Sequence, residues 1–152
     1  MIGALLTAPL IAVFFIGWRL VGLPFIPFHL FDWTARILPG RVITFGIDSM
    51  VKVIRRLGIA DTASAAKAAE QAMAIAVFLV AGVLAAAVLF SVLRAVRTRR
   101  PVLTGTVLGA LASVASVLVT GSLGRTSSIP ATIGGLWIIS AFVAWGAALG
   151  WA

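Results

Sequence analysis

Four long runs of apolar residues follow one another along the chain. They cover about residues 2–22, where Arg19 is the one charged interruption, and then 71–93, 102–124 and 130–151. Because an α-helix rises 1.5 Å per residue, about 20 residues are enough to cross a hydrocarbon core of about 30 Å. The pattern therefore predicts an all-α fold, a polytopic membrane helix bundle with four transmembrane helices that form a single transmembrane domain.

The segment between the first two runs, about residues 24–60, has an amphipathic pattern instead. It opens with "PFIPFHLFDWTARILPG", in which His29, Asp32 and Arg36 are three and four positions apart. Residues at this spacing share one face of a helix, and two phenylalanines fall on another face. Helices of this kind lie in the plane of the lipid headgroups. We therefore expect a first interfacial helix over about residues 27–38.

Residues 41–59 repeat the amphipathic pattern and predict a second interfacial helix. Together the two helices would form an amphipathic hairpin between the first two transmembrane helices. Beyond the hairpin the pattern predicts one continuous helix from Thr62 to Arg97, which is longer than a bilayer core requires. Lys67 and Glu70, three positions apart on this helix, are expected to pair near the membrane surface.

Composition supports a membrane location and narrows the chemistry. Of the 152 residues, 62% are hydrophobic and 11% are charged, against roughly 45–50% and about 25% in soluble domains. The absence of cysteine excludes disulfides, thiolate catalysis and cysteine-ligated metals. One histidine and four scattered acids give no metal-ligand cluster, and no phosphate loop or nucleophile motif is present. We therefore predict no catalytic, cofactor-binding or metal site within this chain.

The net charge of +8 is concentrated at the ends of the apolar runs. Arg94, Arg97, Arg99 and Arg100 stand between the second and third runs, where such residues favour a cytoplasmic location. This orientation places both termini inside and residues 24–70 outside. Nucleic-acid binding would call for aromatic residues near the arginines, and the sequence has none there. The lipid bilayer is thus the expected partner of this charge, and nucleic acid is not.

His29, Asp32 and Arg36 admit two interpretations. A histidine three residues from a carboxylate can share a proton with it and titrate near neutral pH, which would suit a proton relay or a quinone headgroup site. The same three residues can also be an interfacial polar face with an ion pair between Asp32 and Arg36. The second interpretation is favoured, because nothing in the sequence shows a cleft around these residues.

Glycines are regularly spaced in the last two runs. Gly105 and Gly109 lie four apart, as do Gly146 and Gly150. Small residues at this spacing let helix backbones approach closely in a membrane. If the last two helices are antiparallel, the two pairs fall near the same membrane surface and can pack on each other. Packing between copies, in a homo-oligomer, remains the alternative.

The stretch "LPFIPFHLFDWTARILPGRVITFGIDSMVKVIRRLGIADTASAAKAAEQAMAI" resembles a known family. It is similar to the segment after the first transmembrane helix in bacterial membrane-bound molybdopterin-dependent oxidoreductases with a sulfite-oxidase-type catalytic domain. The most specific parts are "LFDW-x-AR-x-LPG", "ITFGID" and "AK-x-AEQAMAI". The similarity extends to "WIISAFVAWGAALGWA" and so covers most of the chain.

The resemblance implies an amino-terminal membrane domain in the bacterial inner membrane, followed by a molybdopterin-binding domain. The resemblance assigns no cofactor-binding residue to this chain, so molybdopterin is expected only in a downstream or partner domain. The implied function is to anchor that oxidoreductase domain and to dock or couple it to the membrane. A small integral-membrane subunit or a transporter-like module, without a redox role, is the alternative that the sequence leaves open.

Overall fold

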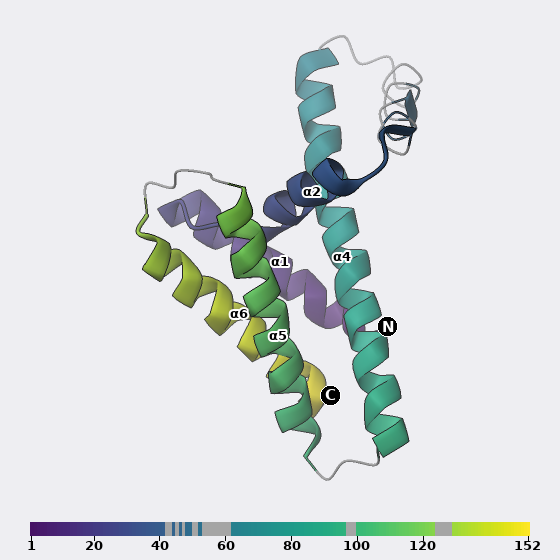
Figure 1. The fold of residues 1–152 in the computed structure, drawn as a ribbon, viewed down its shortest axis with the longest axis vertical. Helices are drawn as coiled ribbons and strands as arrows, with labels where there is room; N and C mark the ends of the chain where they lie inside the picture. Colours follow the sequence, from purple (N-terminus) through teal and green to yellow (C-terminus); the bar gives the residue numbers. More distant parts are fainter. Residues whose placement is uncertain are drawn as a thin grey trace.

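The computed structural model describes residues 1–41, 44, 46, 48, 49, 52, 62–96, 100–123 and 129–152. The regular elements within these residues are helices, which confirms the all-α prediction (Figure 1). Their bounds are α1 Ile2–Val21, α2 Ile26–Ile37, α4 Thr62–Val96, α5 Pro101–Ser122 and α6 Ala131–Trp151.

α1, α4, α5 and α6 are each long and apolar enough to cross a membrane, as the hydropathy pattern predicts. Mean hydropathy in their most apolar windows ranges from 1.7 to 2.8, yet only 17–39% of the residues in those windows are buried inside the bundle. Most of the apolar side chains therefore face outwards, where water would penalise them and lipid does not. The fold is that of a multi-pass membrane protein.

α1 ends in a tight turn that redirects the chain. Gly22 has a φ of 74°, and its N–H donates to the carbonyl of Trp18 at 3.0 Å, while Leu23 N–H donates to Gly17 at 3.2 Å. The bond from Gly22 to Trp18 is that of an αL cap, in which glycine adopts the left-handed conformation without penalty. Pro24 follows, so the helix cannot continue, and the chain leaves the direction of α1.

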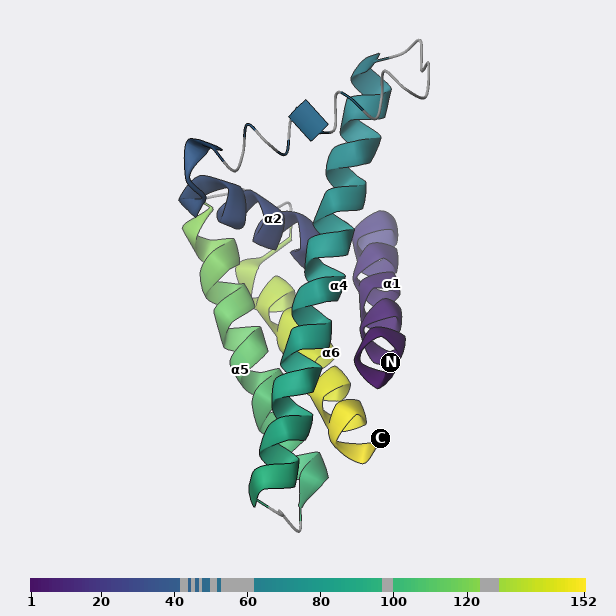
Figure 2. The ribbon, with the colours of Figure 1, turned by 90° about the vertical axis from the view of Figure 1, so that its right-hand side faces the viewer.

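α2 lies across the end of the bundle rather than along it (Figure 2). It is fixed there by Phe25, Ile26 and Pro27, which are buried, and it packs on α4 and α5. Its bounds, Ile26–Ile37, are one residue earlier than the expected 27–38. The second helix of the expected hairpin, 41–59, lies for the most part outside the described residues.

α4 is a single uninterrupted helix of 35 residues. Its first residue is the predicted one, and it is helical up to the last residue described before Arg97. The helix extends beyond α2 on one side of the bundle (Figure 2). α1 packs on α4 and α6, and α5 packs chiefly on α6.

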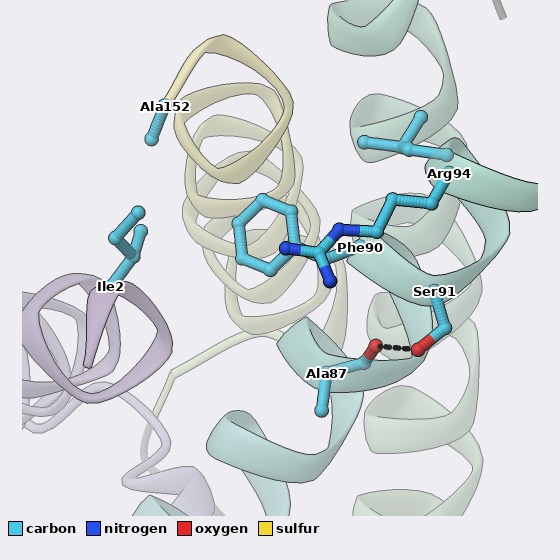
Figure 3. Close-up of a pocket in the computed structure, with 7 residues that line it drawn as sticks. Ile2, Ala87, Phe90, Ser91, Arg94 and Ala152 are labelled. Carbon is cyan, nitrogen blue, oxygen red and sulfur yellow. Dashed lines mark hydrogen bonds between the residues drawn. The ribbon is translucent and has the colours of Figure 1, made fainter. Parts of the chain in front are cut away.

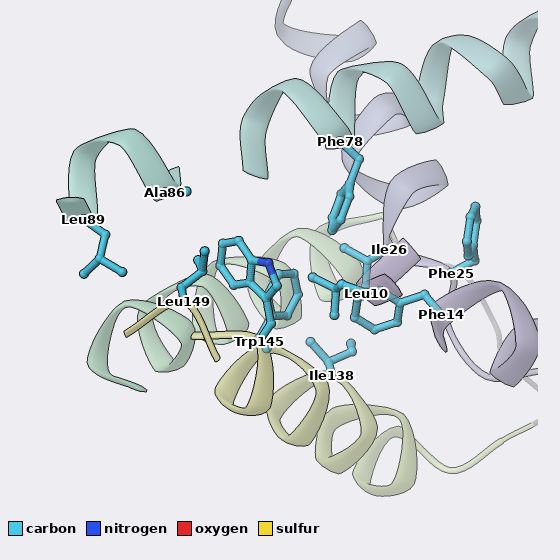
Figure 4. Packing of buried hydrophobic residues seen from close by; sticks show 11 residues of the cluster. Leu10, Phe14, Phe25, Ile26, Phe78, Ala86, Leu89, Ile138, Trp145 and Leu149 are labelled. Atoms are coloured by element: carbon cyan, nitrogen blue, oxygen red, sulfur yellow. The ribbon is translucent and has the colours of Figure 1, made fainter. Parts of the chain in front are cut away.

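Aromatic rings join α1, α4 and α6 at the centre of the bundle (Figure 4). Phe14 of α1 is completely buried, and its ring centre lies 5.5 Å from Phe142, 6.1 Å from Trp137 and 6.3 Å from Phe78. Tilted and edge-on pairs at these distances are favourable. Phe14 of α1 therefore contacts rings of both α4 and α6.

Candidate functional site

His29 lies in the contact between α2 and α5. The ring is half-buried, and its Nδ1 lies 3.0 Å from Oγ1 of Thr120 in the last turns of α5. The sequence pattern placed His29 on a polar face that would be directed at headgroups, whereas the structure directs it at a neighbouring helix. Sequence reasoning missed Thr120, since one threonine at the end of an apolar run carries no signal of its own.

Asp32 and Arg36 lie further along α2 and form the expected ion pair. Their closest charged atoms are 3.9 Å apart, and the side chains are 35% and 59% exposed. An exposed pair at this distance contributes at most a few tenths of a kcal/mol, because solvent screens it. Of the two interpretations that the sequence allows, a proton-relay or quinone site and a polar face with an ion pair, this geometry agrees with the second.

A charged notch joins α2 to α4. Lys67 donates to Glu70 at 2.8 Å, as their spacing predicts, and both residues line a small cavity that Asp32 also borders. The cavity has a volume of about 50 Å³. Since a water molecule occupies about 30 Å³ of liquid, this cavity has room for one or two water molecules but is too small for an organic substrate. The two helices thus bring together charges that lie far apart in the sequence.

An apolar crevice of about 200 Å³ lies between the spanning helices. It is lined by Thr7, Leu10, Leu30, Phe78, Ala81, Gly82, Ala85, Ala112, Ala115, Ser116, Phe142 and Trp145. Leu30 is the lining residue that α2 contributes, and the other residues come from all four spanning helices. None of these lining residues titrates, so the crevice can hold an apolar group but cannot itself transfer protons.

Two indole N–H groups, of Trp137 and Trp145, are buried without a hydrogen-bond partner among the described residues. In Figure 4 the indole nitrogen of Trp145 is on the side of its ring towards Leu10 and Phe78. A buried donor without an acceptor costs free energy. Both nitrogens are enclosed by the core, so the structure gives them no contact with the crevice surface.

The four glycines that the sequence singles out meet at the contact between α5 and α6. A Cβ at Gly105 would lie 2.8 Å from the nitrogen of Gly150, and one at Gly146 would lie 2.9 Å from Cα of Gly109. Real Cβ atoms essentially never come within 3.0 Å of another heavy atom in this way. The two backbones are therefore in direct contact over several turns, within one copy of the chain.

A second close contact, between α1 and α4, escaped the sequence analysis. A Cβ at Gly3 would lie 2.7 Å from Cβ of Ala86, and Gly82 faces Thr7, which is completely buried. The Thr7 hydroxyl donates to the Gly3 carbonyl at 2.7 Å, so its hydrogen-bond donor has a partner within α1 itself. The signal was available, because Gly3 with Thr7 and Gly82 with Ala86 are also small residues four apart.

The arginine-rich end of the bundle is only partly described. Arg94 lies in the last turn of α4 and Arg100 directly precedes α5, and both are exposed. Arg97 and Arg99 lie outside the described residues. Arg94 and Ala152 line the same crevice, so the end of α6 is also on this side.

Among the described residues, no group of three or more histidine, cysteine, aspartate or glutamate side chains could hold a metal ion. No protein-family model matches the chain, and neither the curated proteins nor the solved structures gave a significant match. The resemblance to membrane-bound molybdopterin-dependent oxidoreductases therefore stays a prediction.

The contact between His29 and Thr120 is expected to stabilise the docking of α2 on α5. Replacing Thr120 by valine keeps the shape of the side chain and removes the hydroxyl, which should lower the free energy of unfolding by about 0.5–1.5 kcal/mol. A double-mutant cycle with His29→Ala, followed by unfolding in detergent micelles, isolates the pair. Thr132→Val, at an exposed position on α6, is the matched control. A coupling energy of zero would show that the contact contributes nothing.

Proposed function

We propose that this chain is a membrane-anchoring domain for a molybdopterin-dependent, sulfite-oxidase-type oxidoreductase domain, which it docks or couples to the bacterial inner membrane. The sequence resemblance supplies the class of partner. The four spanning helices supply the anchor. The described residues provide packing surfaces and an apolar crevice, and in this proposal the redox chemistry is carried out by the partner domain.

The observation that carries the proposal is the close packing of α6 on α5 up to its last turn. Leu149 is completely buried, and a Cβ at Gly150 would lie 2.8 Å from Cα of Val102 in α5. A helix held so closely cannot swing independently of the bundle. A domain connected to this end would therefore be positioned against the membrane surface, whereas a loose tether would only keep it nearby.

Molybdenum content tests this proposal in the native host. The chain is tagged at its amino terminus at its own locus and purified from solubilised inner membranes, and the bound molybdenum is measured by mass spectrometry. We expect molybdenum to copurify with the tagged chain, and to move to the soluble fraction when the segment encoding residues 1–152 is deleted. A purified chain free of molybdenum, with an unchanged distribution after deletion, contradicts the anchoring function.

That negative result would favour the second candidate, a small membrane subunit or transporter-like module without a redox role. The apolar crevice of about 200 Å³ is the observation in its favour, because it gives the bundle an internal surface that an anchor does not need. A ligand held there would have to be apolar, given the lining described above.

Orientation decides which compartment a domain at the end of α6 would face. The arginine excess between α4 and α5 favours the cytoplasm for this end, and hence for both termini. In cells that express Ser64→Cys or Thr98→Cys, a membrane-impermeant thiol reagent should label the first variant directly and the second only after permeabilisation. The reverse pattern would place α2 in the cytoplasm.

A further inference from the structure

At the arginine-rich end, an open crevice of about 590 Å³ is lined by residues of α4, the start of α1 and the end of the chain after α6 (Figure 3). Its lining residues are Ile2, Ala87, Phe90, Ser91, Leu93, Arg94 and Ala152. Apolar side chains therefore form most of the wall, and Arg94 is its one cationic side chain. This volume is within the range of about 300–1,000 Å³ that is usual for ligand sites.

Arg94 extends into this crevice. In Figure 3 its guanidinium reaches from α4 past Phe90 towards the space between Ile2 and Ala152. The ion pairs found among the described residues join Asp32 to Arg36 and Lys67 to Glu70, so neither involves Arg94. The sequence also has no aspartate or glutamate after Glu70. The second half of the chain thus offers no acidic side chain to neutralise this guanidinium.

The other polar side chain of the crevice is already engaged. Ser91 donates its hydroxyl hydrogen to the carbonyl of Ala87 at 2.8 Å, one turn earlier in α4. Arg94 is therefore the donor that a ligand would meet, and its planar guanidinium can bind two oxygens of a phosphate at once. Its position in the last turn of a spanning helix is the level at which lipid phosphates lie.

We propose that this crevice binds one anionic phospholipid, with its phosphate on Arg94 and the first part of an acyl chain against Phe90 and Ile2. A ligand with an acyl chain fits this crevice better than a soluble anion does, since most of the residues that line it are apolar. The inference concerns the membrane and does not depend on the anchoring function proposed above.

Native mass spectrometry of the purified chain with titrated lipids tests the site. Phosphatidylglycerol, which is anionic, and phosphatidylcholine, which is zwitterionic, are compared with identical acyl chains, so that only the headgroup differs. The first phosphatidylglycerol should bind about fivefold more tightly, the ratio expected when one arginine contacts an anionic headgroup. Arg94→Gln should abolish this preference. Arg100→Gln, which removes a charge from an exposed position near the same surface but outside the crevice, should preserve it.

A second pair of variants tests the acyl-chain part of the site. Ala87→Phe fills the crevice and should weaken the binding of both lipids, whereas Val88→Phe, at an exposed position one residue further along α4, should not. Equal losses of preference in Arg94→Gln and Arg100→Gln would show a diffuse surface charge and overturn the proposal. Competition by inorganic phosphate as effective as that by a short-chain phosphatidylglycerol would overturn it too, by showing a simple anion site.

Discussion

Replacing Gly146 by alanine is expected to lower the free energy of unfolding by about 1–3 kcal/mol, the usual cost of inserting a group into a filled contact. The added Cβ would lie 2.8 Å from the nitrogen of Gly109 and 2.9 Å from its Cα, and it would also press on the carbonyl oxygen of Gly105. All three are backbone atoms, which cannot rotate away as a side chain can. The helices α5 and α6 must therefore separate, and they lose dispersion contacts along their length.

The matched control is Gly135→Ala on the same helix, where an added Cβ would meet no atom within 4 Å. There the substitution should be neutral or stabilise the helix by up to about 1 kcal/mol, since alanine has the higher helix propensity. Unfolding in mixed micelles with increasing SDS measures both variants. Light scattering shows whether the oligomeric state changes. If Gly146→Ala altered the oligomer and left the stability of the monomer intact, the glycines would serve contacts between copies.

Phe14→Ala is expected to be the most destabilising single substitution in the aromatic centre. The ring is completely buried and contacts rings of both α4 and α6. A cavity costs about 24 cal/mol per Å³, so removing a phenyl ring of roughly 100 Å³ should cost about 2–3 kcal/mol. The loss is mainly one of packing, because the unfolded reference helices are surrounded by lipid or detergent rather than by water.

Phe15→Ala is the control for this prediction. Phe15 is the next residue on α1 and is 46% exposed, so surrounding lipid can fill much of the space that its ring leaves. Its loss should cost about 1 kcal/mol or less, mainly through its ring contacts with Trp18 and Phe25. Thermal unfolding in the same detergent compares the two variants directly. Equal destabilisation by both would show that the packing around Phe14 is not the dominant contact between the spans.

The spanning helices could be predicted from the sequence because each one satisfies a local rule. A run of about 20 apolar residues has to cross the bilayer as a helix, whatever its neighbours are. The first apolar run, predicted over about residues 2–22, ends within one residue of the last residue of α1. The amphipathic period of residues 27–38 likewise predicted the helix α2 to within one residue of its observed bounds.

The contacts between helices were less predictable, because hydropathy does not say which face of a helix meets which partner. The pairing of His29 with Thr120 joins residues 91 positions apart, and no local pattern in the sequence links them. Gly3 and Thr7 have the same spacing as the glycines of the last two spanning helices. Thr7 lies among leucines, however, so this pair is harder to recognise in the sequence as a small-residue contact. Such contacts depend on the relative placement of whole helices, which only the structure supplies.

The length of α4 determines how far its first residues stand from the membrane. If Arg94 marks the headgroup level at one end, a hydrocarbon core of about 30 Å takes up roughly 20 residues, which leaves about 12 residues, or roughly 18 Å of helix, beyond the opposite surface. Electrostatic interactions are screened over about 8 Å at physiological ionic strength. The headgroup layer on that side takes up about 5–7 Å of this length. The tip of α4 therefore stands more than one screening length above the lipids, where a molecule that approaches it senses the charges of the protein more strongly than the charge of the bilayer.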